Sequence, residues 1–298
     1  MSEGTAASSK VWRRMGALSR EALLRGLSPL ELRAILADIA RVRAGRLSAA
    51  DLMKRWREDR FLRPSPVDPR ASLALQRDLW HALPKEFVGV ELSPLTSLAS
   101  ASHLTGVGQN RVITTMRGTE LVSDATQPLA LEASRLRRSG HARVHLAACC
   151  RIAHAWDTQP DAPAHATQFA LASSSPDGGG LGTEADLLDL HLDYWREVIG
   201  RFVPAGRVQL VVWDAALAAV LEQRGTRDDL IVVPASTRTP FRNPYSTAAF
   251  RLVGGAGDAE PVDLGDGGFV GWTQLLTRNR KDRCLVSSIN VDALLALQ

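Results

Sequence analysis

Three closely spaced prolines divide the chain into two parts of different character. Pro64, Pro66 and Pro69 cannot continue a helix, because proline lacks an amide donor and its ring clashes with the preceding turn. Before this break the pattern is helical and rich in arginine, and after it short apolar runs of strand length appear. The sequence therefore predicts a basic helical extension over residues 1–65 and a separate domain over residues 66–298.

The extension has the pattern of a helical hairpin. Leucine and isoleucine recur at helical spacing between residues 19 and 44, and Ser28 with Glu31 three positions later has the pattern of a capping box. Gly45 is a plausible helix end, and a second helix is expected from Ser48 through Trp56.

Charge is distributed unevenly between the two parts. Residues 1–64 hold 14 Lys and Arg against 7 Asp and Glu, which leaves 22 against 25 for the rest of a chain whose net charge is +4. A basic arm of +7 on a body of −3 can attract RNA or an acidic protein partner. The alternative is a solvated helical face, because the basic residues alternate with Leu, Ile and Ala.

Composition is that of a globular protein, with 45% hydrophobic and 23% charged residues. No stretch approaches the roughly 18 apolar residues of a membrane span, and the first residues contain no apolar signal-peptide core. We therefore expect no membrane partner and a cytoplasmic location. The three cysteines include the adjacent pair Cys149 and Cys150, which cannot easily bridge each other, so no disulfide framework is expected.

Neither a metal site nor a phosphate loop is indicated. His141 and His145 fall on an expected strand, where four residues span about 13 Å, which is too far to share one zinc ion. The glycine-rich residues 173–182 lack the Gly-Lys-Ser/Thr of a phosphate loop and are expected to form a flexible loop. Cys149 and Cys150 are interpreted as small buried residues and not as nucleophiles.

The second part of the chain predicts an α+β fold. Several apolar runs of strand length follow one another directly, which favours a mostly antiparallel sheet flanked by helices over a doubly wound one. The expected strands cover residues 88–92, 112–115, 144–148, 169–172, 208–213, 230–233, 248–253 and 285–289.

Two segments of this domain resemble a known family. Residues 87–94 (FVGVELSP) are similar to motif 1 of class II aminoacyl-tRNA synthetases, a strand that ends in a proline at the dimer interface of that family, and Pro94 matches the proline. Residues 121–126 (LVSDAT) resemble an element of the histidyl-tRNA synthetases and of the ATP phosphoribosyltransferase regulatory subunit, with Asp124 and Thr126 matching. The resemblance implies a class II core that forms a homodimer.

A third segment resembles motif 2, two antiparallel strands that hold ATP in this family. The matching residues are Arg151, His165 and Phe169. By resemblance, Arg151 is the catalytic residue that holds the α-phosphate, His165 approaches the γ-phosphate and Phe169 stacks on adenine. A planar guanidinium suits bidentate contact with phosphate. The implied cofactors are ATP and Mg²⁺.

The resemblance also implies a pocket for an amino acid or another carboxylate. Residues 244–250 (PYSTAAF) are similar to a tyrosine-containing strand of the histidyl branch, so Tyr245 is expected to line this pocket, with Arg238 or Arg242 nearby. Glu120 and Asp124 are candidates for binding an amino group. Thr126 belongs to the same expected substrate site, and the later Asp266-Gly267-Gly268 resembles a further element of the branch.

Two departures from the family pattern concern ATP. Ala153 stands where motif 2 normally carries an acidic residue, and residues 285–294 contain neither the glycine nor the arginine of motif 3. Asp292 occupies about the place of that arginine, where a carboxylate repels triphosphate. Among nearby residues only Arg280 or Arg283 is available to compensate.

Two functions therefore follow from the resemblance. The first is a synthetase paralogue without an anticodon-binding domain that activates an amino acid or other carboxylate as an acyl-adenylate for a non-standard acceptor. The alternative is a non-catalytic regulatory or ligand-binding subunit. Loss of the motif 2 acid and the motif 3 arginine favours the second, and retention of Arg151, His165 and Phe169 favours the first.

Overall fold

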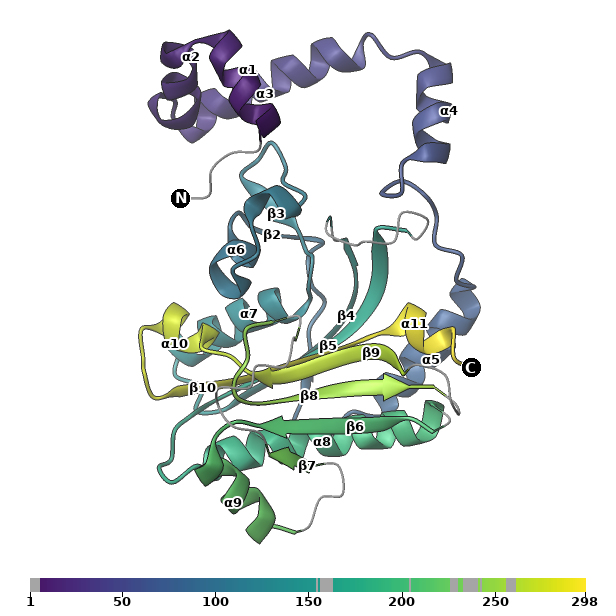
Figure 1. Cartoon of the computed structure of the whole chain (residues 1–298), viewed down its shortest axis with the longest axis vertical. Helices are drawn as coiled ribbons and strands as arrows, with labels where there is room; N and C mark the ends of the chain where they lie inside the picture. Colours follow the sequence, from purple (N-terminus) through teal and green to yellow (C-terminus); the bar gives the residue numbers. More distant parts are fainter. Residues whose placement is uncertain are drawn as a thin grey trace.

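The domain after the proline break is built on one large sheet. The computed structural model describes residues 6–153, 155, 163–203, 205–225, 230–232, 241, 243–255 and 261–298. The strands of the large sheet are β1 (Val88–Gly89), β4 (Val144–Ala153), β5 (His165–Pro176), β6 (Arg207–Val212), β7 (Leu230–Val232), β8 (Ser246–Gly254), β9 (Val262–Phe269) and β10 (Asp282–Asn290). Their order is β1-β4-β5-β10-β9-β8-β6-β7 (Figure 1).

Neighbouring strands of this sheet are antiparallel except in the outer pairs β1–β4 and β6–β7, which are parallel. A small second sheet pairs β2 (Leu95–Ser97) with β3 (Thr119–Leu121). The prediction of an α+β fold with a mostly antiparallel sheet is confirmed.

Helices cover both faces of the large sheet (Figure 1). One face packs against α5 (Pro69–Ala82), α8 (Gly182–Phe202), α9 (Ala215–Gln223) and α11 (Val291–Leu295), and the other against α6 (Ser100–Thr105), α7 (Thr126–Arg138) and α10 (Trp272–Thr277). We call these the α8 face and the α7 face. A 3₁₀ turn, η2 (Gln109–Arg111), precedes β3.

The two faces bury separate cores because successive residues of a strand point to opposite sides. On β5, Phe169 and Leu171 lie in the core of the α8 face, whereas Ala170 and Ala172 lie in the core of the α7 face. The sheet separates the two cores. The position of a residue along its strand therefore decides which of the two cores its side chain faces.

The extension consists of short helices that lie beyond the sheet domain (Figure 1). They are α1 (Ala6–Met15), α2 (Ala17–Glu21), the π-helix η1 (Ala22–Gly26), α3 (Pro29–Ala44) and α4 (Ala49–Glu58). The predicted capping box of Ser28 and Glu31 is present at the start of α3, and Ser48 with Asp51 forms another at the start of α4. None of the helices in the described ranges is long and apolar enough to cross a bilayer.

A hydrogen-bonded histidine lies inside the core of the α8 face. His191 of α8 is fully buried, and its two ring nitrogens lie 2.8 Å from the hydroxyls of Ser173 and Ser287. Trp195 donates its indole N–H to Ser287 at 2.8 Å. Burial lowers the pKa of His191 to about 3, because the apolar surroundings disfavour the charged ring.

We expect this histidine to make the fold sensitive to acid. Between pH 6.5 and about 3 the unfolded chain binds a proton that folded His191 does not, so stability falls as pH is lowered. At 1.4 kcal/mol per pH unit, the contribution of His191 to the loss between pH 7 and 4.5 is about 2–3 kcal/mol. Urea unfolding at pH 7 and at pH 4.5 measures this loss of stability.

The variant His191→Gln keeps an amide for the two serines and removes the titration, so its stability is expected to change less between the two pH values. The control is His81→Gln, which alters an exposed histidine on α5. If His191→Gln showed the same pH dependence of stability as the wild type, His191 would not be the cause of the loss of stability in acid.

Candidate functional site

The structure divides the predicted site residues between the two faces of the sheet. Arg151 pairs directly with Thr167, and both point to the α8 face, together with His165 and Phe169. Gln168, the next residue along β5, points to the opposite face, where the backbone amide of Ala125 donates to it at 2.7 Å. Asp124 and Tyr245 lie on this α7 side, so the predicted ATP residues and amino-acid residues do not meet.

Two carboxylates are joined on the α7 side through a tyrosine and an asparagine. We call Asp124, Asn243, Tyr245 and Asp266 the aspartate–tyrosine cluster. Asn243 donates from Nδ2 to Asp124 Oδ2 at 3.3 Å and lies 3.4 Å from the Tyr245 hydroxyl, which donates to Asp266 Oδ1 at 2.9 Å. Burial, followed by the charge of Asp266, raises the pKa of Tyr245 well above its usual value, so the phenol remains a hydrogen-bond donor.

The sheet beneath the cluster fixes its position. Gln168 of β5 binds the amide of Ala125, next to Asp124, and donates from Nε2 to the Ser288 hydroxyl of β10 at 2.8 Å. Ser288 in turn pairs with Asp266 across the β10–β9 ladder. The loop that carries Asp124 is therefore anchored to the strand that is paired with β9.

A guanidinium and an aromatic ring complete the surroundings of the cluster. Arg251 of β8 is the direct ladder partner of Asp266, and its guanidinium carbon lies 4.9 Å from the centroid of the Phe241 ring. The Phe241 ring lies 5.6 Å from that of Tyr245. The site thus brings a positive group and two negative groups around one pair of aromatic rings. Arg238 and Arg242, which the sequence placed near Tyr245, lie outside the described residues.

Gly268 makes room for this arrangement, and its neighbour Gly267 makes room on the opposite face of the sheet. A Cβ atom on Gly268 would lie 2.7 Å from the ring of Tyr245, and one on Gly267 would lie 2.4 Å from the Cβ of Ser287. Contacts this short do not occur between real side chains, so any larger residue displaces its neighbour. Gly268 is therefore required by packing against Tyr245 on the α7 face, and Gly267 by packing against Ser287 and Phe250 on the α8 face.

Thr126 acts on the site through Asp124. Its amide and its hydroxyl donate to Asp124 Oδ1 at 2.9 and 2.7 Å, and its side chain is fully buried at the start of α7. These two hydrogen bonds fix Oδ1 of Asp124, and the other carboxylate oxygen, Oδ2, faces Asn243. Thr126 is placed as a positioning residue and not as a ligand contact.

Glu120 is engaged by its own chain. Its fully buried carboxylate accepts hydrogen bonds from the amides of Ala99 and Ala101 at 3.0 and 2.8 Å and from Gln109 Nε2 at 2.8 Å. These bonds organise the start of α6. The structure does not bring Glu120 into the aspartate–tyrosine cluster, and we do not include it in the proposed site.

Arg151 lies in a polar group on the α8 face. Its Nε donates to His165 Nδ1 at 2.9 Å and its Nη1 to the Thr167 hydroxyl at 3.2 Å, while its Nη2 lies 3.5 Å from Asp292 Oδ2. Asp292, found where the family has an arginine, thus forms an ion pair with the arginine that was expected to bind phosphate.

This polar group ties the sheet to the segment that leads from the extension. Because Nδ1 of His165 accepts from Arg151, Nε2 carries the proton and donates to the backbone carbonyl of Arg63 at 2.8 Å. Ser65 donates its hydroxyl to Asp292 at 3.2 Å. Arg151 and His165 therefore hold the proline-rich connection against the ends of β4 and β5.

Phe169 is a core residue. Its side chain is fully buried, and its ring lies 4.9 Å from that of Trp80, 6.0 Å from that of Tyr194 and 6.4 Å from that of Trp195. No part of the ring is exposed to receive a base.

The residues that the resemblance assigned to ATP therefore do not fit one nucleotide site. Arg151 is already engaged with His165, Thr167 and Asp292, and Phe169 is enclosed. Arg283 and Arg280 do not compensate for Asp292, because they lie at the opposite end of β10, roughly 25 Å away by strand length. We derive no reaction step through ATP from these residues.

Arg280 and Arg283 lie instead beside a separate pocket of about 340 Å³. Arg283 forms ion pairs with Asp177 and with Glu184 of α8, both in the same chain. Apart from these two arginines, none of the residues that the sequence assigned to substrate or ATP lines this pocket.

The cysteines have the properties of buried thiols. Burial raises the pKa of Cys149 to about 12 and that of Cys150 to about 11, so neither is a thiolate near neutral pH. Within the described ranges no group of three His, Cys, Asp or Glu side chains is arranged to hold a metal ion.

Comparisons with known proteins give fold likeness without sequence likeness. No protein-family model matches the chain, and no curated protein matches it. A solved ATP phosphoribosyltransferase regulatory subunit/histidyl-tRNA synthetase from Bacillus halodurans superposes with a TM-score of 0.59 at 11% identity, covering 79% of this chain and 82% of that one. A histidine–tRNA ligase subunit from Alicyclobacillus acidocaldarius gives the same TM-score and identity over 79% of this chain and 94% of its own.

The chain has the fold of a class II aminoacyl-tRNA synthetase core. A pyrrolysyl-tRNA synthetase from Desulfitobacterium hafniense superposes with a TM-score of 0.51 at 13% identity, over 99% of this chain and 82% of that one. The resemblance inferred from residues 87–94 and 121–126 is thus confirmed at the level of the fold. In this class II core, the aspartate–tyrosine cluster is the candidate functional site.

Sequence reasoning identified Asp124 and Tyr245 but missed their partners Asn243 and Arg251. A signal for Arg251 was present, since it is a charged residue between Phe250 and Leu252 on an otherwise apolar strand. Such a residue on a sheet covered on both faces is expected to have a polar partner.

Proposed function

We propose that this class II synthetase-like chain binds a small molecule with a protonated amine and a carboxylate, such as an amino acid, at the aspartate–tyrosine cluster. It acts as a ligand-binding or regulatory subunit. The observation that carries the proposal is the grouping of Asp124 and Asp266 with Arg251 around Tyr245 and Phe241.

The charges of the cluster match such a ligand. Among the described residues, Asp124 Oδ2 has the weak 3.3 Å contact from Asn243 as its hydrogen bond, so an ammonium group gains a charge-assisted hydrogen bond there. Arg251 supplies the positive charge for the ligand carboxylate, and the Phe241 ring beneath its guanidinium supports its orientation. The printed name of one structural neighbour, a regulatory subunit, is consistent with a role in binding without turnover.

Activation of a carboxylate with ATP and Mg²⁺ is the competing function implied by the family resemblance. It requires a phosphate-binding group on the same face as the bound amino acid, and Arg151 and His165 serve the opposite face. We therefore expect no ATP–pyrophosphate exchange with any of the standard amino acids.

Calorimetric titration of the standard amino acids tests the proposal. We expect one of them to bind the wild-type chain, and Asp124→Asn to weaken its affinity about 10–100-fold, since a hydrogen bond to a charged group contributes about 1.5–3 kcal/mol. The matched control is Asp193→Asn, the same change at an exposed position on α8, which is expected to leave affinity unchanged.

Two further measurements separate the competing functions. Arg251→Gln is expected to lower the affinity for the amino acid but not the affinity for the corresponding amine, which lacks the carboxylate. Arg151→Ala is expected to leave binding unaltered. Pyrophosphate exchange that disappears in Arg151→Ala would instead establish an adenylate-forming enzyme, and absence of binding by every amino acid would refute the assigned ligand class.

A further inference from the structure

The pocket beside Arg280 and Arg283 lies at the end of the sheet where β8 and β10 begin and β9 ends. It has a volume of about 340 Å³, and its lining includes Thr247 of β8, Phe269 of β9 and Cys284 of β10. None of the four residues of the aspartate–tyrosine cluster lines it. Small-molecule sites occupy about 300–1,000 Å³, so this volume is sufficient for a small ligand.

A carboxylate oxygen without a partner belongs to the wall of this pocket. Glu184, in the first turn of α8, lines the pocket, and its side chain is only 5% exposed. Its Oε1 accepts from Arg283, whereas Oε2 is buried and accepts no hydrogen bond from the described residues. A buried acceptor without a donor costs stability, so this oxygen points to a ligand that donates to it.

Asp214 supplies a second free oxygen to the same pocket. Its Oδ1 accepts from the amides of Ala216 and Leu217 at 2.9 and 3.1 Å and so caps α9. In the part of the chain that the structure describes, Oδ2 has no hydrogen-bond donor. Two carboxylates with one unoccupied oxygen each favour an ammonium group, which has three hydrogens to donate.

The backbone of the pocket is strained at two residues. Leu181 and Thr247, which both line it, have φ angles of 62° and 35°, in the left-handed region that residues other than glycine avoid. The carbonyl of Thr247 accepts from the amides of Trp213 and Asp214 at 2.8 and 3.2 Å, which ties the start of β8 to the residue with the free oxygen. Strained residues of this kind gather at ligand sites.

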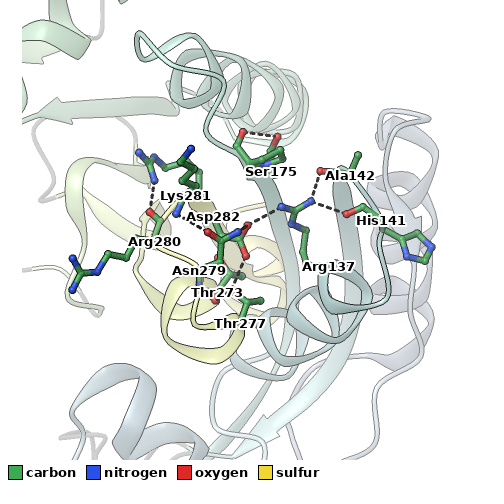
Figure 2. Close-up of polar contacts among 12 residues, drawn as sticks. Arg137, His141, Ala142, Ser175, Thr273, Thr277, Asn279, Arg280, Lys281 and Asp282 are labelled. Carbon is green, nitrogen blue, oxygen red and sulfur yellow. Dashed lines mark hydrogen bonds and ion pairs between the residues drawn. The ribbon is translucent and has the colours of Figure 1, made fainter.

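Arg280 places a positive charge at the exposed side of the pocket. The residue is exposed, and its guanidinium points away from Asp282 (Figure 2). Within the described ranges it forms no ion pair, whereas Arg283 is neutralised by Asp177 and Glu184. A ligand whose ammonium group binds the two carboxylates therefore gains a further contact if its other end is anionic.

We propose that this pocket is a second ligand site, which binds a small primary amine with an anionic group at its other end. The ammonium group donates to Glu184 Oε2 and Asp214 Oδ2, and the anionic group pairs with Arg280. The site is independent of the one proposed at the aspartate–tyrosine cluster, because the two share no residue.

Calorimetric titration of the full chain with ω-amino acids tests the proposal. β-Alanine, γ-aminobutyrate and ε-aminocaproate carry the two charges at increasing separation, whereas n-butylamine and butyrate each lack one of them. We expect at least one ω-amino acid to bind. We expect n-butylamine and butyrate to bind at least about tenfold more weakly, because each loses a charge-assisted contact.

Asp214→Asn removes the free anionic oxygen and leaves a side-chain oxygen to cap α9, since asparagine caps a helix as well as aspartate does. It is expected to lower the affinity for the ω-amino acid at least about tenfold. The matched control is Asp68→Asn, the same change at the exposed cap of α5, which is expected to leave the affinity unchanged. Circular dichroism checks that both variants keep their helices.

The positive end of the site is tested in the same way. Arg280→Gln is expected to lower the affinity for the ω-amino acid and to leave the affinity for n-butylamine unchanged. The matched control is Arg278→Gln, which removes an exposed arginine that does not line the pocket.

Asp124→Asn separates this site from the aspartate–tyrosine cluster. Loss of ω-amino-acid binding in Asp124→Asn but not in Asp214→Asn would assign the ligand to the cluster and overturn this proposal, while the proposed function would stand. Absence of binding by all the ω-amino acids, or an affinity for n-butylamine equal to theirs, would also overturn it.

Discussion

Replacing Asp282 by alanine is expected to destabilise the sheet domain by about 3–5 kcal/mol, because it leaves a buried guanidinium without its carboxylate. Figure 2 shows Asp282, at the start of β10, between Arg137 of α7 and the side chains of Thr277 and Asn279. Arg137 Nη2 lies 2.7 Å from Asp282 Oδ1, and the two side chains are only 10% and 2% exposed. Urea unfolding measures the loss.

A surface pair on the same helix provides the matched control. Arg135 and Glu132 of α7 also lie 2.7 Å apart, but their side chains are 63% and 31% exposed. Glu132→Ala is expected to change stability by less than about 1 kcal/mol, because water screens an exposed pair. Equal losses of stability in Asp282→Ala and Glu132→Ala would contradict the view that burial determines how much each ion pair contributes to stability.

Replacing Phe169 by alanine is expected to cost about 3–5 kcal/mol of stability, the range for removing a large aromatic side chain from a core. The ring is enclosed by Trp80, Tyr194 and Trp195. Phe169→Leu retains most of the volume and is expected to lose less than half as much. Urea unfolding followed by tryptophan fluorescence measures both.

The Phe169 variants also distinguish a core residue from a nucleotide platform. For a core residue, the loss follows the volume removed and appears in unfolding without any nucleotide. If the ring instead stacks on adenine, Phe169→Leu is as damaging to ATP binding as Phe169→Ala while stability stays near that of the wild type. That outcome would contradict the placement of the ring described here.

Local signals in the sequence predicted local structure well. The capping pattern of Ser28 and Glu31 gave the start of α3, because a cap depends on residues three positions apart. The second helix, expected from Ser48, is α4. Several short motifs in the expected order after residue 86 were sufficient to recognise the class II fold, which the chain shares with solved structures at 11% identity.

The sequence did not indicate on which face of the sheet a strand residue lies. Arg151 lies on the α8 face and its neighbour Cys150 on the α7 face, so an alignment shifted by a single residue reverses the side on which a functional group appears. The order of the motifs along the chain did not indicate which residues of each strand point to which face. The structure therefore separates Arg151 from Asp124 although both matched the same family.

Other errors came from pairing between distant segments. Residues 173–182 were expected to be a loop, but β5 extends to Pro176 because these residues pair with the start of β10. Residues 112–115 were expected to form a strand, yet η2 ends at Arg111 and only a single bridge forms at Thr114. The strand β9 was missed because its glycines and aspartates give no apolar run.

The separation of the two faces has a consequence for how this protein can change during evolution. Under the function proposed above, substitutions around Asp124 and Tyr245 would alter ligand recognition on one side of the sheet, while substitutions around Arg151 and Asp292 would alter the attachment of the extension on the other. Since the sheet keeps the two sets of side chains out of contact, each can diverge without compensating changes in the other. A related chain can therefore acquire a new ligand while keeping the same extension.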